Sequence, residues 1–199
     1  IPQDQVWVSY PDFEEQLYNK DSPLIEVTPL TSGRKFHWFS YYDKFQTDPK
    51  DNLALGMEVN FEDRSPEPKD SIDIGIINLE DNKWNKIGSS SAWSWQQGCM
   101  LQWRPDSKYE VLWNDRKEGR FLCNLLNIQN GKTKQLPYPV YHIHPSGKTA
   151  ICADFARIEY MRPGYGYCGI EDNRRDELAP DSLGCWLMDL DTAQTTELF

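Results

Sequence analysis

Arginine and tyrosine side chains alternate within one long polar segment of the sequence, residues 156–184. The five that could do chemistry are Arg157, Tyr160, Arg162, Tyr165 and Tyr167. A tyrosine can accept and return a proton, and an arginine can neutralise a carboxylate. Together they suit β-elimination of a uronic-acid sugar, so we expect Tyr160 and Arg162 to be catalytic. The other three would contact the substrate, and structural packing within an ordered loop is the alternative.

A second group with acid/base and aromatic character lies at residues 37–44. His37 could act as a general acid or base, and we assign it a catalytic role. Tyr41 and Tyr42 offer rings on which a sugar could stack, so we expect them to bind substrate. The alternative is that these rings belong to the core and that His37 is a hydrogen-bonded surface residue.

Two tryptophans and two glutamines form a third group. Trp93 and Trp95 lie on the same face of an extended segment because side chains alternate along it. With Gln96 and Gln97 they give an aromatic-plus-amide composition common in carbohydrate sites, although packing between sheets uses tryptophan as readily. We expect Trp95, Gln96 and Gln97 to bind substrate.

Arg116 follows Asn114 and Asp115 in a polar turn. As a functional residue it would bind a carboxylate, sulfate or phosphate. The alternative is an ordinary hairpin turn.

His142 and His144 are spaced so that both could point the same way in a strand. They could hold a divalent metal ion, with His37 as an available third ligand. No glycine-rich phosphate loop and no Gly-x-Ser-x-Gly nucleophile motif occur in the sequence, so we expect no other cofactor.

The composition excludes several classes of protein. The chain has 199 residues, 21 Lys+Arg against 31 Asp+Glu, a net charge of −10 and 13% aromatic residues. The aromatic content is too high for a disordered chain, and the acidity argues against nucleic-acid binding. No apolar run approaches the ~20 residues that span a bilayer. The sequence begins with Ile1, so we expect a trimmed chain whose missing segment could have carried a targeting signal. Among the five cysteines, Cys168 and Cys185 flank the long polar segment and could form a disulfide.

Two landmarks alternate along the chain and reveal the elements that must position these residues. The first is a Pro-containing polar turn leading into an apolar strand, at Pro49, Pro105 and Pro145. The second is an apolar strand running into a tight polar turn, in the segments 74–83, 122–132 and 185–194. Together they define three four-stranded units at 36–88, 91–136 and 138–199.

The spacing of 40 residues between Pro105 and Pro145 is typical of β-propeller blades. We therefore predict an all-β protein with three blades of a β-propeller, and a β-sandwich is the alternative. The insertions 61–71 and 156–184 should be loops. Residues 1–35 form an N-terminal extension with a short helix at 12–18 or a strand near 25, which could complete another blade.

Three blades cannot close a ring, because propellers typically have 4–8. We expect an incomplete ring, part of a six- to eight-bladed propeller, with the remaining blades in the same or another chain.

Five motifs, read together, resemble one family. They are Phe36–Lys44, Asn60–Pro66, Trp93–Gly98, Asn114–Arg116 and Arg162–Tyr167. The combination resembles bacterial TolB-like β-propellers of mostly unknown function, over about residues 34–199. It is distantly similar to the oligogalacturonate lyase propellers, although Pro139 stands where those enzymes place a glutamine metal ligand.

The resemblance implies a protein about twice this length and a periplasmic or extracellular location. It also implies binding or lyase-type cleavage of an acidic oligosaccharide on the channel face. A non-enzymatic scaffold that binds a protein or ligand is the alternative.

Overall fold

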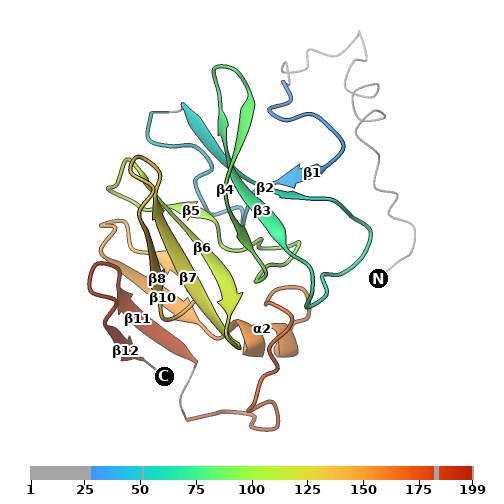
Figure 1. Ribbon diagram of the computed structural model, residues 1–199. Coiled ribbons are helices and arrows are strands. Elements are labelled where there is room, and N and C mark those ends of the chain that lie inside the picture. The colour runs from blue at the N-terminus through green and yellow to red at the C-terminus, as the bar shows by residue number, and fades with distance from the viewer. Residues whose placement is uncertain (1–27, 51, 182–183, 199) are drawn as a thin grey trace, which may run out of the picture.

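The chain forms three four-stranded antiparallel sheets in succession (Figure 1). The computed structural model describes residues 28–50, 52–181 and 184–198. In each sheet the strands lie side by side in chain order, as in a propeller blade. The predicted all-β fold with three blades and an incomplete ring is confirmed. The helix expected at 12–18 and the strand expected near 25 lie outside the described residues.

The three sheets are named blades one, two and three. Blade one contains β1 (Phe36–Trp38), β2 (Leu53–Val59), β3 (Ile72–Asn78) and β4 (Lys83–Ser90). Blade two contains β5 (Gln102–Trp103), β6 (Glu110–Lys117), β7 (Arg120–Asn127) and β8 (Thr133–Leu136). Blade three contains β9 (Val140–Ile143), β10 (Thr149–Ala153), β11 (Cys185–Asp189) and β12 (Thr195–Glu197).

One side-chain turn recurs after the third strand of every blade. Asn78, Asn127 and Asp189 each accept a hydrogen bond from the backbone N–H two residues ahead, at 2.9, 3.1 and 3.0 Å. This Asx turn satisfies a backbone N–H of the residues that reverse the chain. The same three residues pair with the first residue of the second strand, Leu53, Glu110 or Thr149. The blades therefore share one register, and equivalent positions can be compared directly.

Two apolar cores hold the blades together. Blade one packs against blade two through residues that include Leu55, Ile74, Trp103 and Trp113. Blade two packs against blade three through residues that include Leu112, Leu125, Trp186 and Met188. Because side chains alternate along a strand, the middle blade supplies one face to each core.

The long insertion of blade three, residues 156–184, departs from the prediction. The expectation that it is loop throughout is wrong at its start, because α2 (Phe155–Met161) is helical. Asp154 caps this helix by accepting hydrogen bonds from the N–H groups of Ala156 and Arg157, at 2.9 and 3.2 Å. No helix in the described part of the chain is long and apolar enough to cross a membrane.

Candidate ligand-binding site

The first strands of the three blades converge, and the candidate site is built on them. The backbone carbonyl of Gln46, in the segment after β1, accepts a hydrogen bond from the Trp103 indole of β5 at 3.1 Å. Lys44 in the same segment reaches His142 of β9, with 3.0 Å between Nζ and Nδ1. Blades one and three therefore meet beside their first strands, where a third apolar cluster that includes Phe155 and Tyr167 packs against Tyr41 and Tyr141.

Four tyrosines gather there, and we call Tyr41, Tyr42, Tyr141 and Tyr165 the tyrosine cluster. The rings of Tyr41 and Tyr42 lie 4.3 Å apart between centroids. A hydrogen bond with Tyr42, partial burial and the nearby phenol groups of Tyr141 and Tyr165 raise the pKa of Tyr41. Phenol groups from blade one, blade three and the long insertion thus lie in the region around Tyr41. A phenol hydroxyl can both donate and accept hydrogen bonds.

Arg162 stands beside this cluster. Its Nη2 donates to the Tyr165 hydroxyl at 2.9 Å, and its guanidinium carbon lies 3.7 Å from the centroid of the same ring. The residue is exposed, so most of its five donors stay open to a ligand. The stacking fixes the plane of the guanidinium before any ligand arrives.

Lys44 carries the second positive charge, but its own chain surrounds it. Its amine lies 2.8 Å from the Asp43 carboxylate and 5.6 Å from the centroid of the Tyr141 ring. Its side chain is only 1% exposed. Since an ammonium group only donates, Nδ1 of His142 must accept in this pair. Lys44 therefore holds the segment after β1 against β9. Arg162 is the positively charged side chain beside the cluster that a ligand can reach.

Gln97 supplies an amide to the cluster from the segment before β5. Its side chain donates to the Tyr141 hydroxyl at 3.3 Å, and its backbone carbonyl accepts from Ser40 at 3.0 Å. The Oε1 atom is buried and has no hydrogen-bond partner among the described residues. Gln97, predicted to bind substrate, is thus next to the cluster, whereas its neighbour Gln96 is exposed.

Arg157 and Arg116, which were predicted to bind substrate, bind other parts of the chain. Arg157 forms an ion pair with Asp172 at 2.9 Å and donates to backbone carbonyls of residues 174, 177 and 178. Arg116 donates to the carbonyls of Cys168 and Pro68, so it ties the insertion of blade three to that of blade one. Both guanidinium groups hold the insertions in place.

Tyr167 and Tyr160 occupy opposite environments. Tyr167 is completely buried and stacks on Phe155, with centroids 4.1 Å apart. Burial raises its pKa well above the usual value for tyrosine, and Asn114 donates to its hydroxyl at 3.0 Å. It is a core residue with no surface for a substrate. Tyr160 is 50% exposed on α2.

His37 and Trp95 lie within blade one and the segment that follows it. His37 contacts Glu58 at 2.9 Å and the edge of Trp84, with centroids 5.0 Å apart. Trp95 donates to the Arg64 carbonyl at 2.7 Å and packs on Trp38 and Trp93. Within the described residues, no contact joins His37 to Tyr160 or Arg162, so the expected catalytic trio is not assembled.

The two histidines proposed as metal ligands have separate partners. His142 contacts Lys44, whereas His144 lies after β9 with its Nδ1 2.9 Å from the Ser146 hydroxyl. In the described ranges, no three His, Cys, Asp or Glu side chains are grouped to hold a metal ion. The pair does not enter the candidate site as a metal centre.

Sequence reasoning missed Tyr141 as a site residue and did not include Lys44 among the binding residues. Tyr141 could have been found from its place in the first strand of a blade, directly before His142.

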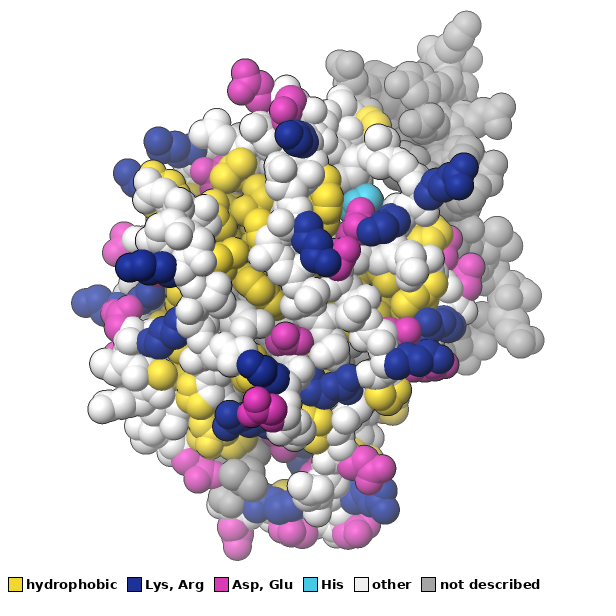
Figure 2. All heavy atoms as spheres, viewed as in Figure 1, with side chains coloured by type: hydrophobic (Ala, Val, Ile, Leu, Met, Phe, Trp, Pro, Cys, Tyr) yellow, Lys and Arg dark blue, Asp and Glu magenta, His cyan; other side chains and the backbone are white. Residues whose placement is uncertain are grey.

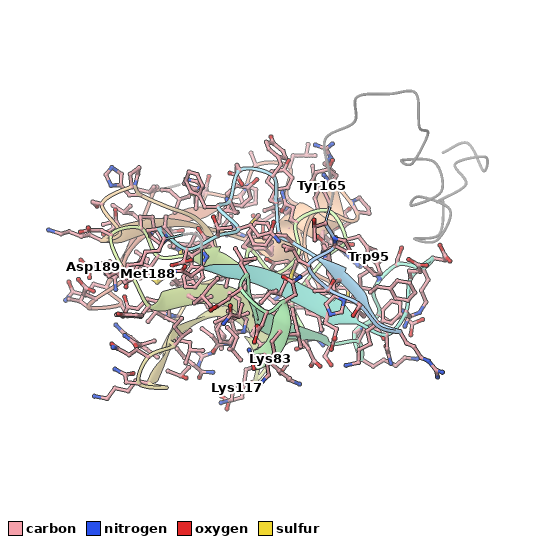
Figure 3. The ribbon with its side chains drawn as sticks, turned by 90° about the horizontal axis from the view of Figure 1, so that it is seen from above. Lys83, Trp95, Lys117, Tyr165, Met188 and Asp189 are labelled. Atoms are coloured by element: carbon pink, nitrogen blue, oxygen red, sulfur yellow. The ribbon has the colours of Figure 1, made fainter. Side chains whose placement is uncertain are left out.

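In Figure 3, Tyr165 and Trp95 lie on the opposite side of the view from Asp189, the last residue of β11, whose side chain forms the Asx turn.

No protein-family model and no curated protein matches this sequence. Among solved structures it is similar to TolB from Acinetobacter baumannii, with a TM-score of 0.51 and 11% identity over 85% of this chain and 33% of that chain. The chain has a TolB-like propeller fold. It spans about a third of the length of that TolB.

A second similar structure is the β-propeller domain of the Trilobed protease from Pyrococcus furiosus. It is 12% identical over 81% of this chain and 44% of that chain, with a TM-score of 0.46. The likeness to oligogalacturonate lyases that the sequence suggested has no support from these comparisons.

Proposed function

We propose that this propeller binds an acidic oligosaccharide at the tyrosine cluster and Arg162. The observation that carries the proposal is the convergence of Tyr41, Tyr42, Tyr141 and Tyr165 beside one exposed guanidinium. Aromatic rings offer flat apolar surface to sugar rings, and phenol hydroxyls match sugar hydroxyls as donors and acceptors.

Arg162 provides the preference for an acidic sugar. Lys44 is already neutralised by Asp43, whereas Arg162 forms no ion pair with a carboxylate of the described residues. A planar guanidinium binds a carboxylate with two parallel hydrogen bonds. A uronate carboxyl is therefore the group that this site would select.

The pairing of Arg162 with Tyr165 also supports cleavage by β-elimination. In that reaction a base removes the proton on the carbon next to the uronate carboxyl. The glycosidic C–O bond then breaks with a proton returned to the leaving oxygen, and a carbon–carbon double bond forms. Arg162 would stabilise the charge on the carboxyl, and Tyr165, which contacts it at 2.9 Å, would exchange the proton. This assigns to Tyr165 the role expected of Tyr160 and leaves out His37.

The test is a panel of uronic-acid polysaccharides, with a methyl-esterified pectin as the uncharged control. Binding is measured by calorimetry, and cleavage by the absorbance of the unsaturated product. We expect Arg162→Ala to abolish preference for the free acid, while Arg175→Ala, at an exposed arginine of the same insertion, has no effect. We expect Tyr165→Phe to remove any cleavage, while Tyr109→Phe, outside the cluster, retains it.

Each outcome has a distinct meaning. Binding without an unsaturated product would reject the lyase step and keep the binding site. Absence of binding across the panel would reject the proposal and favour the alternative, a non-enzymatic scaffold for a protein or other ligand. The fold is compatible with either, because propellers serve both purposes.

A periplasmic or extracellular location is part of the same proposal. Such a location would expose the site to polymeric sugars, and fractionation of the source cells tests it. Figure 2 shows Lys and Arg interspersed with Asp and Glu on one face of the molecule, and we do not propose a nucleic-acid partner.

A further inference from the structure

A serine and a histidine face each other in the exposed turn between β9 and β10. The Ser146 hydroxyl oxygen lies 2.9 Å from Nδ1 of His144. Both residues are exposed, so a reagent in solution can reach the pair. A hydroxyl within hydrogen-bond reach of an imidazole nitrogen is the arrangement by which a base activates a serine nucleophile. What this pair can do depends on where its proton lies.

The backbone fixes which ring nitrogen of His144 accepts a hydrogen bond. The N–H of Ser146 donates to the same Nδ1 atom at 3.1 Å. A backbone amide only donates, so Nδ1 carries no proton and offers its lone pair. The neutral ring therefore has its proton on Nε2, and Nδ1 faces the Ser146 hydroxyl as an acceptor.

A second backbone amide sets the direction of the hydroxyl group. The N–H of Lys148 donates to the Ser146 hydroxyl oxygen at 3.4 Å. Because that oxygen accepts from Lys148, its own proton is left to donate to Nδ1 of His144. Oxygen, proton and nitrogen therefore stand in the order that general-base catalysis requires.

Backbone contacts hold the turn in place. The N–H of Gly147 donates to the His144 carbonyl, and the N–H of His144 donates to the Thr149 carbonyl, both at 2.8 Å. The Gly147 carbonyl accepts from Nε of Arg104 in blade two at 2.7 Å. Gly147 has a φ of +68°, and a Cβ there would collide with the Pro105 carbonyl, so the turn packs directly on blade two. The pair is thus positioned before any reagent arrives.

The equivalent turn of blade one shows that capping the turn does not require a histidine. There Asp48 stands before the proline, and its carboxylate accepts from the N–H of Lys50, two residues ahead, at 3.3 Å. His144 accepts the corresponding bond from Ser146 in blade three. Arg104 holds this position in blade two. Among the three turns, as far as the structure describes them, only that of blade three pairs a basic nitrogen with a hydroxyl.

We propose that Ser146 is an acyl-acceptor site, with His144 as its general base, for small activated acyl donors such as phenyl esters, thioesters and acyl phosphates. Because the pair lies on an exposed turn, the donor must be reactive by itself. The proposal is independent of the proposed sugar binding.

The reaction transfers one acyl group to the serine. Oγ of Ser146 forms a bond to the acyl carbon, and the hydroxyl proton passes to Nδ1 of His144. The bond between the acyl carbon and the leaving group breaks, and the leaving group departs with the electron pair. His144 then gives its proton to the leaving group or to water, and Ser146 remains as an ester.

The experiment treats the full chain with p-nitrophenyl acetate and locates the acetyl groups by tandem mass spectrometry of peptides. The internal reference is Ser65, an exposed serine with no hydrogen bond to a histidine among the described residues. General bases typically accelerate reactions by 10²–10⁴-fold, so we expect Ser146 to be acetylated about 10²-fold faster than Ser65. Fragment ions separate Ser146 from lysines and cysteines, which also react with this ester.

The variant His144→Asn separates the base from the cap of the turn. An asparagine oxygen can accept from the Ser146 N–H, as in an Asx turn, but it does not take up a proton. We expect this variant to keep the melting temperature of the natural chain and to acetylate Ser146 no faster than Ser65. Since both serines are measured in the same chain, a change in reagent or stability cancels from their ratio.

Two results would overturn the proposal. One is acetylation of Ser146 at the same rate as Ser65 in the natural chain, because His144 would then serve only to cap the turn. The other is fast acetylation of Ser146 that persists in His144→Asn, because the base would then be another group.

Discussion

The side chain of Asn114 links blade two to blade three. It forms with Val140 the pair of hydrogen bonds that backbone groups usually form between strands. Its amide donates to the Val140 carbonyl at 2.8 Å, and its side-chain oxygen accepts from the Val140 N–H at 2.8 Å. The same amide donates to Tyr167 at 3.0 Å, and the residue is fully buried. Both partner residues, Val140 and Tyr167, are buried, so water cannot readily replace the amide.

Replacing this residue should therefore destabilise the fold strongly. We expect Asn114→Leu to lower the free energy of unfolding by roughly 2–5 kcal/mol, because it leaves a buried N–H and C=O unsatisfied. The measurement is urea denaturation. Asn85→Ala, at an exposed asparagine, should change stability by less than about 0.5 kcal/mol. Equal effects of the two substitutions would contradict this role.

Asp70 illustrates a charged contact whose contribution depends on pH. Arg64 donates to both of its carboxylate oxygens, at 2.5 and 2.9 Å, and holds the pKa of Asp70 at about 2. An unfolded aspartate titrates at about 3.9. The contact therefore stabilises the fold above pH ~4, and the stabilisation is lost as the pH falls through about 2.

The substitution Arg64→Ala should isolate that contribution. Its stability deficit relative to the natural protein should be largest at neutral pH and should narrow as the pH falls from 4 to 2. Denaturation at a series of pH values measures the difference. A deficit that stays constant over this range would mean that Arg64 acts only by stacking on Phe61, 3.6 Å from the ring centroid.

At the scale of elements, blade one depends on two glycines that admit an indole. A Cβ on Gly75 would overlap the Trp84 ring, whereas a Cβ on Gly56 would lie 3.0 Å from it. We expect Gly75→Ala to cost about 1–3 kcal/mol, as overpacking does, and Gly56→Ala to cost less. Thermal or urea unfolding measures both. Trp84→Leu should weaken the difference between the two alanine variants, and an unchanged difference would rule out the indole as its cause.

The strands were predictable from sequence because each blade repeats the same turns. Pro49, Pro105 and Pro145 mark one end of the strands, and the Asx residues mark the other. The α2 helix was missed because seven residues are too few to show a helical period within a polar insertion. Its N-cap, Asp154, was nevertheless visible directly after an apolar strand.

The site was less predictable, because its members come from separate blades. Tyr41, Tyr42, Tyr165 and Arg162 were selected by residue type, and the fold brings them together. Tyr167 has the same residue type and spacing but faces the core. Sequence pattern does not separate a tyrosine that lines a surface from one that packs under a helix, because only the path of the insertion decides this.

At the scale of the whole molecule, none of the five cysteines forms a disulfide. Cys99, Cys123 and Cys152 are buried, and burial raises the pKa of each thiol, that of Cys152 to about 12. Cys168 and Cys185 are half-buried, and the disulfide between them that the sequence allowed is not formed. Blade packing therefore holds the described propeller without covalent cross-links.

Alkylation of the native protein should reveal this division. The thiolate is the reactive form of cysteine, and it reacts only where the reagent can reach it. The half-buried Cys168 and Cys185 should therefore be modified first at pH 8. The other three should react only after denaturant is added. Mass spectrometry of tryptic peptides gives the order of modification. Early modification of Cys99 or Cys123 would indicate that the interfaces between blades open readily.

The contacts of Arg116 and Arg157 affect which residues of the insertions can be substituted as the sequence evolves. Arg116 and Arg157 grip the insertions mainly through backbone carbonyls, which every amino acid possesses. Residues at those carbonyl positions can therefore be exchanged without loosening either loop, and new ligand preferences can arise while the framework stays fixed. Gly169 cannot be exchanged in this way, since any side chain there would collide with the Arg116 guanidinium. Variation in the insertions is thus freer at the carbonyl positions and restricted at Gly166, Gly169 and Asp172, where the framework uses a close backbone approach or a side chain.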